Sequence, residues 1–247
     1  MMTGLSIVPL NPPIAIADGT TTKFLTLSNL LVADGWVVLM VSFNEFALLH
    51  GASGSAAGNS AQYIQNDISN DAGNGARLLA GNLHWWDHVF QFIYKTYGHW
   101  PIVPLGVSWG GWHSYIAAIN RTAQIIAYAS MCGVSILSHV ATAATGTANW
   151  TALTTTGADI TSSALNGVSI PGWIGYSSTD TVVGTTDPAA LYNAAHTAGA
   201  PVTNLSDTTN GHGLFGTDIG PGGSGFTGTT IMDWFTATVD PLAPKVL

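Results

Sequence analysis

The sequence predicts an α/β protein with a doubly wound, mostly parallel sheet of about six strands and helices on both of its faces. Continuous apolar runs, such as residues 36–43 (WVVLMVSF), have the composition of strands that are covered on both sides. Amphipathic stretches of ten or more residues alternate with these runs, and such alternation is typical of parallel β-α-β crossovers. With 247 residues, the chain has the length of one such domain, spanning 1–247.

The elements follow one another in a regular order. The threonines at 20–22 can cap a helix that is expected to run through Asp34, and Gly35 separates this helix from the strand 36–43. Apolar residues at three- and four-residue steps predict a helix over 78–97, which ends at Gly98. The later strands are expected at 102–107, 124–131, 168–176 and near 201–205, and the later helices at 111–120, 188–197 and near 229–239.

Composition excludes several classes of protein. Only 7% of the residues are charged, the formal net charge is -8, and five Lys and Arg residues in all cannot form a patch for nucleic acid. No apolar stretch reaches the ~20 residues of a membrane span, and no positive charge precedes the first apolar segment as it would in a secretory leader. The single cysteine, Cys132, excludes an intrachain disulfide and a cysteine-rich metal site. The low charge correlates with an exported or virion-associated setting, without determining the compartment.

A serine stands where the strand 102–107 passes into a helix, in the sequence GVSWG that begins at Gly106. At such a junction the pattern G-x-S-x-G makes a tight turn that lifts the serine oxygen above the sheet edge. The tripeptide Gly-Val-Ser also begins at Gly133 and Gly167, but only the first copy has the closing glycine and the strand-to-helix context. We therefore interpret Ser108 as a nucleophile.

A serine nucleophile needs a base to take its proton. His212 lies in a glycine-flanked loop (TNGHG) directly after the last expected parallel strand, where a base overhangs the sheet edge. The other histidines after Ser108 fit less well, because His113 and His196 fall within expected helices and His139 follows its strand too early in the chain. His212 is therefore the expected base.

The base in turn needs a carboxylate that orients it. Asp180 follows the strand 168–176 in a short polar loop, which brings it to the same edge of the sheet as His212. Asp187 is the alternative, although its position before Pro188 is also that of a helix cap.

These motifs resemble those of the α/β-hydrolase superfamily, and of its serine esterases in particular. The similarity covers nearly the whole chain, about 6–239, and is strongest in GVSWGG (106–111), IPGWIGYSSTDTVVG (170–184) and NGHG (210–213). It implies a small variant of the α/β-hydrolase fold in which the nucleophile, the acid and the histidine follow one another along the chain.

The resemblance also implies an oxyanion hole. Its first donor would be the backbone N–H of Trp109, the residue after the nucleophile. The second donor usually comes from the loop after the strand that precedes the first helix, and here that loop contains two consecutive prolines, which have no N–H. Asn11 is our candidate in this loop, with Ile14 and a residue nearer Gly19 as alternatives.

Several tryptophans and histidines outside the proposed triad are candidates for substrate or metal binding. Trp109 and Trp112 flank the nucleophile and are candidates for lining the acyl pocket, although Trp112 is equally compatible with the core. His84 and His88 are four residues apart in the helix 78–97, a spacing that can hold zinc, but the glutamate of an H-E-x-x-H motif is absent. We expect neither a metal nor another cofactor.

Taken together, the sequence predicts a serine hydrolase that cleaves carboxylic esters through an acyl-enzyme. The segment 137–167, rich in Thr, Ala and Gly, is interpreted as a small lid-like insertion with little apolar surface, so short-acyl esters of small molecules or polymers are the expected substrates. Thioester, amide and lyase chemistry stay open, because fold and triad do not determine the leaving group. The alternative is a non-catalytic structural or binding protein, for example a virion or surface component, built on a hydrolase scaffold.

Overall fold

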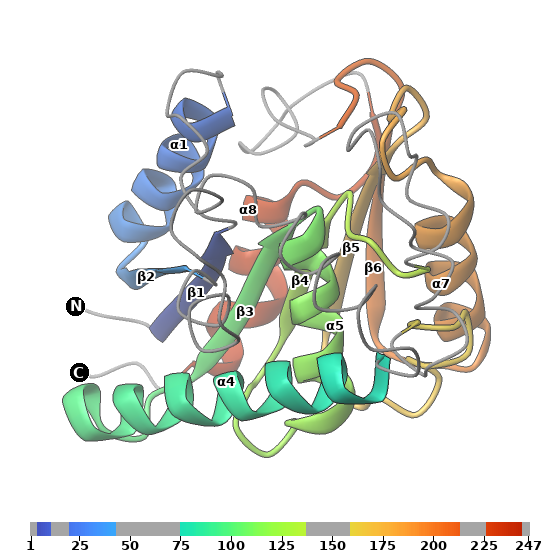
Figure 1. The fold of residues 1–247 in the computed structure, drawn as a ribbon. Coiled ribbons are helices and arrows are strands. Elements are labelled where there is room, and N and C mark those ends of the chain that lie inside the picture. Colours follow the sequence, from blue (N-terminus) through green and yellow to red (C-terminus); the bar gives the residue numbers. More distant parts are fainter. Residues whose placement is uncertain (1–3, 11–19, 43–74, 137–158, 213–225, 244–247) are drawn as a thin grey trace, which may run out of the picture.

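The computed structural model describes residues 4–10, 20–42, 75–136, 159–212 and 226–243. Within them, one sheet runs through the middle of the molecule with helices on both sides of it (Figure 1). The strands are β1 (Gly4–Leu10), β2 (Trp36–Ser42), β3 (Ile102–Val107), β4 (Tyr128–Met131), β5 (Gly172–Ser177), β6 (Val202–Asp207) and β7 (Phe226–Gly228). The helices are α1 (Thr20–Ala33), α4 (Gly75–Tyr97), α5 (Trp109–Asn120), α7 (Thr186–Thr197) and α8 (Ile231–Trp234), and α8 continues into a π-helical turn, η4 (Phe235–Val239), and a 3₁₀ turn, η5 (Asp240–Leu242).

The described strands are ordered β2-β1-β3-β4-β5-β6-β7 across the sheet. Strands β1 to β6 all run parallel to one another, and β7 pairs with β6 in the antiparallel direction. The chain places β2 on one side of β1 and then returns to place β3 on the other side, so the direction of winding reverses between β1 and β3. Doubly wound sheets bind ligands at the carboxyl ends of their strands beside such a reversal. The end of β3 is therefore a favoured position for a functional site.

Each face of the sheet packs against its own hydrophobic core. On one face the helices α4, α5 and α7 contribute the fully buried side chains of Trp86, Trp112 and Leu191. On the other face α1 and the segment from α8 to η4 contribute Leu27 and Trp234. Because both faces are covered, the parallel strands carry apolar residues on both sides, which is the pattern that identified them in the sequence.

The predicted α/β class, with a mostly parallel sheet and helices on both faces, is confirmed. The described sheet has seven strands rather than about six. The strand β7 is antiparallel and only three residues long, so it has too few residues for a periodic pattern in the sequence.

Two strands begin later than the sequence indicated. β4 begins at Tyr128 rather than at 124, and β5 begins at Gly172 rather than at 168. The reason is that the residues before them form turns, in which the N–H groups of Gln124 and Val168 donate to carbonyls three residues earlier. The predicted ranges therefore included the residues that lead into each strand as well as the strand itself.

Several helices begin earlier than expected, by two residues in α5 and α7 and by three in α4. Of the predicted lid-like insertion, residues 137–158 lie outside the described residues, and 159–167 form coil and turn with Leu165 buried. None of the described helices combines the length and the apolar character that crossing a bilayer requires.

Candidate active site

Ser108 occupies the tight turn between β3 and α5. Its backbone has φ 57° and ψ -120°, a combination that residues with a side chain rarely adopt and that costs about 1–3 kcal/mol. Two backbone hydrogen bonds to residues far along the chain hold it there: its N–H donates to the carbonyl of Met131, and its carbonyl accepts from the N–H of Val134, both at 3.0 Å. Ser108 is thus kept in a strained conformation by β4 and by the segment that follows β4. This is the local structure that the G-x-S-x-G pattern predicts.

The glycines around Ser108 are required by close backbone packing. A Cβ atom on Gly106 would lie 1.9 Å from the carbonyl oxygen of Gly110, and one on Gly111 would lie 2.4 Å from the Cα atom of Gly133. The end of β3, the start of α5 and the segment after β4 can therefore approach one another only where these residues lack side chains.

Asp180 and His212 meet beyond the ends of β5 and β6. The Nδ1 atom of His212 lies 2.9 Å from Oδ2 of Asp180, within hydrogen-bonding distance. The carboxyl group is fully buried, whereas the imidazole is 27% exposed. The other carboxylate oxygen, Oδ1, accepts hydrogen bonds from the N–H groups of Val182 at 2.8 Å and Val183 at 3.0 Å.

These contacts determine the charge of the pair. Burial raises the pKa of Asp180, but the hydrogen bond and charge of His212 and the N–H groups of Val183 and Val182 outweigh it, so the pKa lies below its ordinary value. The ionised carboxylate favours the tautomer of His212 whose Nδ1 carries the proton and donates it to Asp180. This leaves Nε2 of His212 as the nitrogen that can accept a proton from a nucleophile.

Asp207, at the end of β6, shapes the loop that carries His212. Its carboxylate accepts hydrogen bonds from the N–H groups of Thr209 at 2.9 Å and Asn210 at 2.6 Å, and from the hydroxyl of Ser177 at 3.1 Å. Ser177 stands opposite Asp207 in the register of β5 and β6, which explains the contact. Burial raises the pKa of Asp207, but these donors outweigh it and lower the pKa.

Gly211, directly before His212, links the loop after β6 to the loop after β5 through hydrogen bonds. Its N–H donates to the hydroxyl oxygens of Ser177 at 3.2 Å and Thr179 at 2.9 Å, and its φ is 66°. Thr179 directly precedes Asp180, so the acid and the histidine are fixed through one hydroxyl network. Sequence reasoning missed this network, although short Ser, Thr and Asp runs after two strands (SST and DTTN) are typical of turns held by side chains.

Cys132 follows β4 and lies beside the same pair. Its thiol is fully buried, its φ is 43°, and its Sγ atom lies 3.7 Å from the carbonyl oxygen of Gly211. One donor atom from each of Cys132, Asp180 and His212 lies within 4.8 Å of the other two, and the described part of the chain holds this one group of three potential metal ligands. In the sequence, Cys132 only excluded an intrachain disulfide and a cysteine-rich metal site, and its position beside Asp180 and His212 was not predicted.

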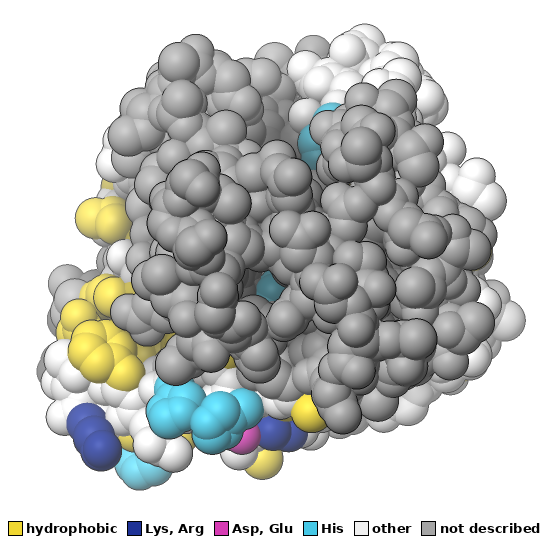
Figure 2. Space-filling model, in the orientation of Figure 1, with side chains coloured by type: hydrophobic (Ala, Val, Ile, Leu, Met, Phe, Trp, Pro, Cys, Tyr) yellow, Lys and Arg dark blue, Asp and Glu magenta, His cyan; other side chains and the backbone are white. Residues whose placement is uncertain are grey.

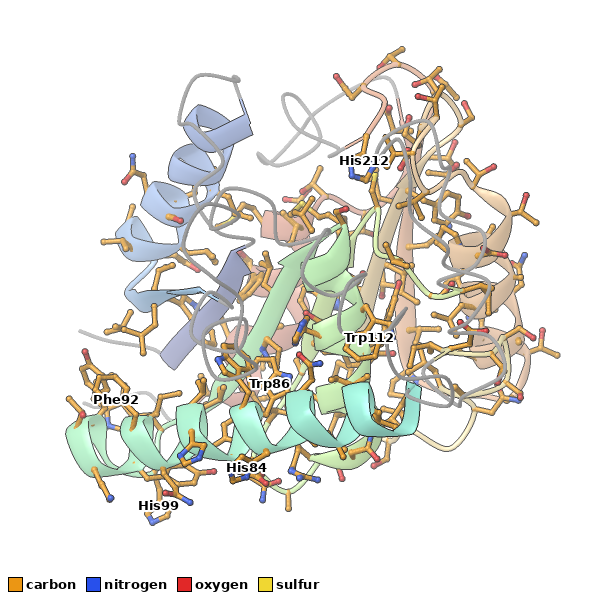
Figure 3. The ribbon with its side chains drawn as sticks, in the orientation of Figure 1. His84, Trp86, Phe92, His99, Trp112 and His212 are labelled. Carbon is orange, nitrogen blue, oxygen red and sulfur yellow. The ribbon has the colours of Figure 1, made fainter. Side chains whose placement is uncertain are left out.

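The alternative histidine in α5 belongs to the core. His113 is fully buried, its ring contacts those of Trp85 and Trp112, and burial holds its pKa well below the ordinary value. Trp112 is itself fully buried, and Figure 3 shows it against α4, whereas His212 lies at the ends of the strands. The burial of Trp112 favours the core role over the acyl-pocket role.

The remaining candidates have separate positions. His196 lies in the last turn of α7, and Asp187 lies in its first turn. Trp109 is the first residue of α5, and its backbone N–H is one of the donors at the start of this helix. The side chain of Trp109 is not among those that the structure describes. Asn11 and His139 lie outside the described residues.

Comparisons with known proteins concern the fold of the chain. No protein-family model matches the sequence, and no curated protein matches it. Among solved structures, the esterase domain of a Rhodothermus marinus protein matches with a TM-score of 0.55 and 18% identity, covering 86% of this chain and 78% of that one. An esterase of Pyrococcus furiosus matches with a TM-score of 0.53 and 13% identity, covering 85% and 75%. An acylaminoacyl peptidase of Pyrococcus horikoshii matches with 0.56 and 12%, covering 86% of this chain and 34% of that one. The likeness shows the fold that the sequence motifs implied: this chain has the α/β-hydrolase fold.

Proposed function

We propose that this protein is a serine hydrolase that cleaves carboxylic esters with short acyl groups. One observation carries the proposal: a strained elbow serine and a hydrogen-bonded Asp–His pair follow strands of one parallel sheet at the same edge. The parallel direction of β3, β5 and β6 makes this convergence possible, because their carboxyl ends all face the same edge. The hydrolase scaffold of the structural neighbours agrees with it.

In the proposed reaction, Ser108 Oγ attacks the ester carbonyl while Nε2 of His212 takes the hydroxyl proton. The tetrahedral intermediate collapses, His212 returns that proton to the departing alcohol, and an acyl-enzyme remains. Water then attacks the acyl group with His212 again as base, and the carboxylic acid leaves. Asp180 acts throughout by holding the imidazole in one tautomer and stabilising the imidazolium.

The oxyanion is stabilised by the backbone N–H of Trp109. This residue is the first of α5, so its N–H belongs to the unpaired donors at a helix start, where the helix dipole also favours negative charge. Asn11 remains the candidate for the second donor.

The preference for short acyl groups follows from the composition of the insertion 137–167. Thr, Ala and Gly dominate it, so it offers a long acyl chain little apolar surface. Both small esters and polymer-linked esters fit this expectation, and the reaction needs no metal or organic cofactor.

A fluorophosphonate probe tests the proposal, because it reacts with a serine that a neighbouring base has activated. We expect labelling of the parent protein at Ser108, no labelling in Ser108→Ala, and loss of ester hydrolysis by a factor on the order of 10³ or more in that variant. Ser178→Ala is the matched control, since Ser178 is an exposed serine of the neighbouring loop and should label like the parent. Absence of labelling in a folded parent protein would favour the non-catalytic binding protein.

A further inference from the structure

Three side chains of different chemistry converge at the edge of the sheet: the Cys132 thiol, the Asp180 carboxylate and the His212 imidazole. One donor atom of each lies within 4.8 Å of the others, and the carboxylate and imidazole are 2.9 Å apart. They come from the ends of three adjacent parallel strands, β4, β5 and β6. Cys132 directly follows β4, whereas Asp180 and His212 lie in the loops after β5 and β6, so the sheet brings the three segments to one edge and the two loops complete the convergence.

The donor set selects a class of metal ion. Thiolate and imidazole together favour Zn²⁺ and related transition ions, whereas Mg²⁺ and Ca²⁺ favour sites made only of oxygen. Zinc lies about 2.3 Å from sulfur and about 2.0–2.2 Å from nitrogen or oxygen, so the ligand atoms of a tetrahedral site stand about 3.4–3.6 Å apart. A movement of roughly 1 Å brings the three donors from their present spacing to this one, and the partly exposed imidazole of His212 is the member best able to make it.

We propose that Cys132, Asp180 and His212 form a binding site for Zn²⁺ that reversibly inhibits the enzyme. The inhibition rests on the proposed hydrolase function, whereas the binding itself does not. A fourth coordination position is left for water.

The reason for inhibition holds for either ring nitrogen of His212. A metal on Nδ1 displaces the proton that is donated to Asp180, and this proton moves to Nε2, so that Nε2 can no longer accept the proton of the serine. A metal on Nε2 occupies the lone pair that would accept the serine proton. In both cases the imidazole can no longer act as a general base.

The charges of the site agree with cation binding. Asp180 is held in its ionised form by its hydrogen bonds, and the chain as a whole has a formal net charge of -8. The Cys132 thiol loses its proton to solvent as its sulfur binds the metal, so one proton is released per ion and binding strengthens as the pH rises. In the metal-free protein the thiol makes a long contact with the Gly211 carbonyl, 3.7 Å from its sulfur.

Co²⁺ is the probe for the site, because a thiolate bound to Co²⁺ absorbs in the near ultraviolet through charge transfer. Cys132 is the only cysteine in the chain, so such a band in the parent protein can come from no other residue. We expect the band on adding Co²⁺ to the metal-free protein, its loss on adding Zn²⁺ or in a denaturant, and its absence in Cys132→Ser. A folded parent protein with no band overturns the proposal, whether or not the Cys132 variants fold.

An exposed histidine pair on α4 supplies the matched control. The Nε2 atoms of His84 and His88 are 3.0 Å apart, and Figure 2 shows histidine side chains at this surface, so the pair is a competing place for a metal ion. The double variant His84→Ala/His88→Ala should keep both the Co²⁺ band and the inhibition. Loss of the inhibition in this variant would assign the inhibitory metal to α4 and overturn the proposal.

Inhibition is measured as the Zn²⁺ concentration that halves hydrolysis of p-nitrophenyl acetate, relative to the metal-free rate of the same variant. We expect full recovery with a chelator and a rise of at least about tenfold in this concentration for Cys132→Ala and Cys132→Ser. An unchanged concentration in a folded Cys132 variant contradicts the site. Ser108→Ala separates the two proposals, because it should lose hydrolysis and probe labelling while keeping the Co²⁺ band.

Discussion

Replacement of Gly106 by alanine tests the packing of the elbow most directly. The new Cβ would lie 1.9 Å from the oxygen and 2.1 Å from the carbon of the Gly110 carbonyl, and 2.7 Å from the nitrogen of Gly111. A carbon and a carbonyl oxygen normally stay about 3.3 Å apart or more, so β3 and α5 must separate by roughly 1.4 Å. The opposing atoms are backbone, which cannot rotate away as a side chain can.

The cost should reach the upper end of the range for overpacking, about 3 kcal/mol of unfolding free energy, which corresponds to a fall in Tm of about 6–12 °C for a chain of this length. Because Ser108 sits on the displaced turn, kcat/KM for an ester should fall by about 10²-fold. Urea unfolding followed by tryptophan fluorescence and hydrolysis of p-nitrophenyl acetate measure the two effects.

Gly167→Ala is the matched control for this substitution. A Cβ on Gly167 has no atom within 4 Å and its φ is outside the left-handed region, so the variant should stay within about 1 kcal/mol of the parent. If Gly106→Ala unfolded at the same urea concentration as Gly167→Ala and kept its kcat/KM, the argument from close packing would be refuted.

Further predictions concern the carboxylates and the substrate. Asp180→Asn should lower kcat by about 10³–10⁴-fold, whereas Asp187→Asn should change it little, and equal losses would contradict the assignment of the acid. Asp207→Asn should reduce the free energy of unfolding by about 1–3 kcal/mol, because an amide oxygen replaces a charged acceptor of several hydrogen bonds. The pKa values of Asp180 and Asp207 are lowered in the folded protein, so their stabilisation is fully present above the ordinary value of about 3.9 and is lost as the pH falls through the folded values. The urea midpoint of the parent protein should therefore drop on acidification below about pH 5, and that of Asp207→Asn should drop less steeply. Equal pH dependence of the two midpoints would argue against this linkage. Among esters of one alcohol, acetyl and butyryl groups should give higher kcat/KM than palmitoyl, and a clear preference for palmitoyl would remove the inference about acyl size.

Local patterns determined much of the architecture. The apolar runs at 36–43 and 102–107 correspond to β2 and β3 within one residue, because a strand buried on both faces needs apolar side chains at every position. The boundaries of β4 and β5 were less accurate, since an apolar approach to a strand has the same composition as the strand. The position of Ser108 was predictable for a similar reason: a tight strand-to-helix turn depends on glycines that are neighbours in the chain.

The sequence by itself therefore determined the fold class, the elbow and a short set of candidate partners for Ser108. Only the tertiary structure decided that His212 pairs with Asp180, that Asp207 holds the intervening loop, and that Cys132 lies beside them. These contacts join residues that are up to 80 positions apart in the chain, between the ends of β4, β5 and β6. They depend on the register of parallel strands and on hydrogen bonds between side chains, and neither leaves a periodic signal in one sequence.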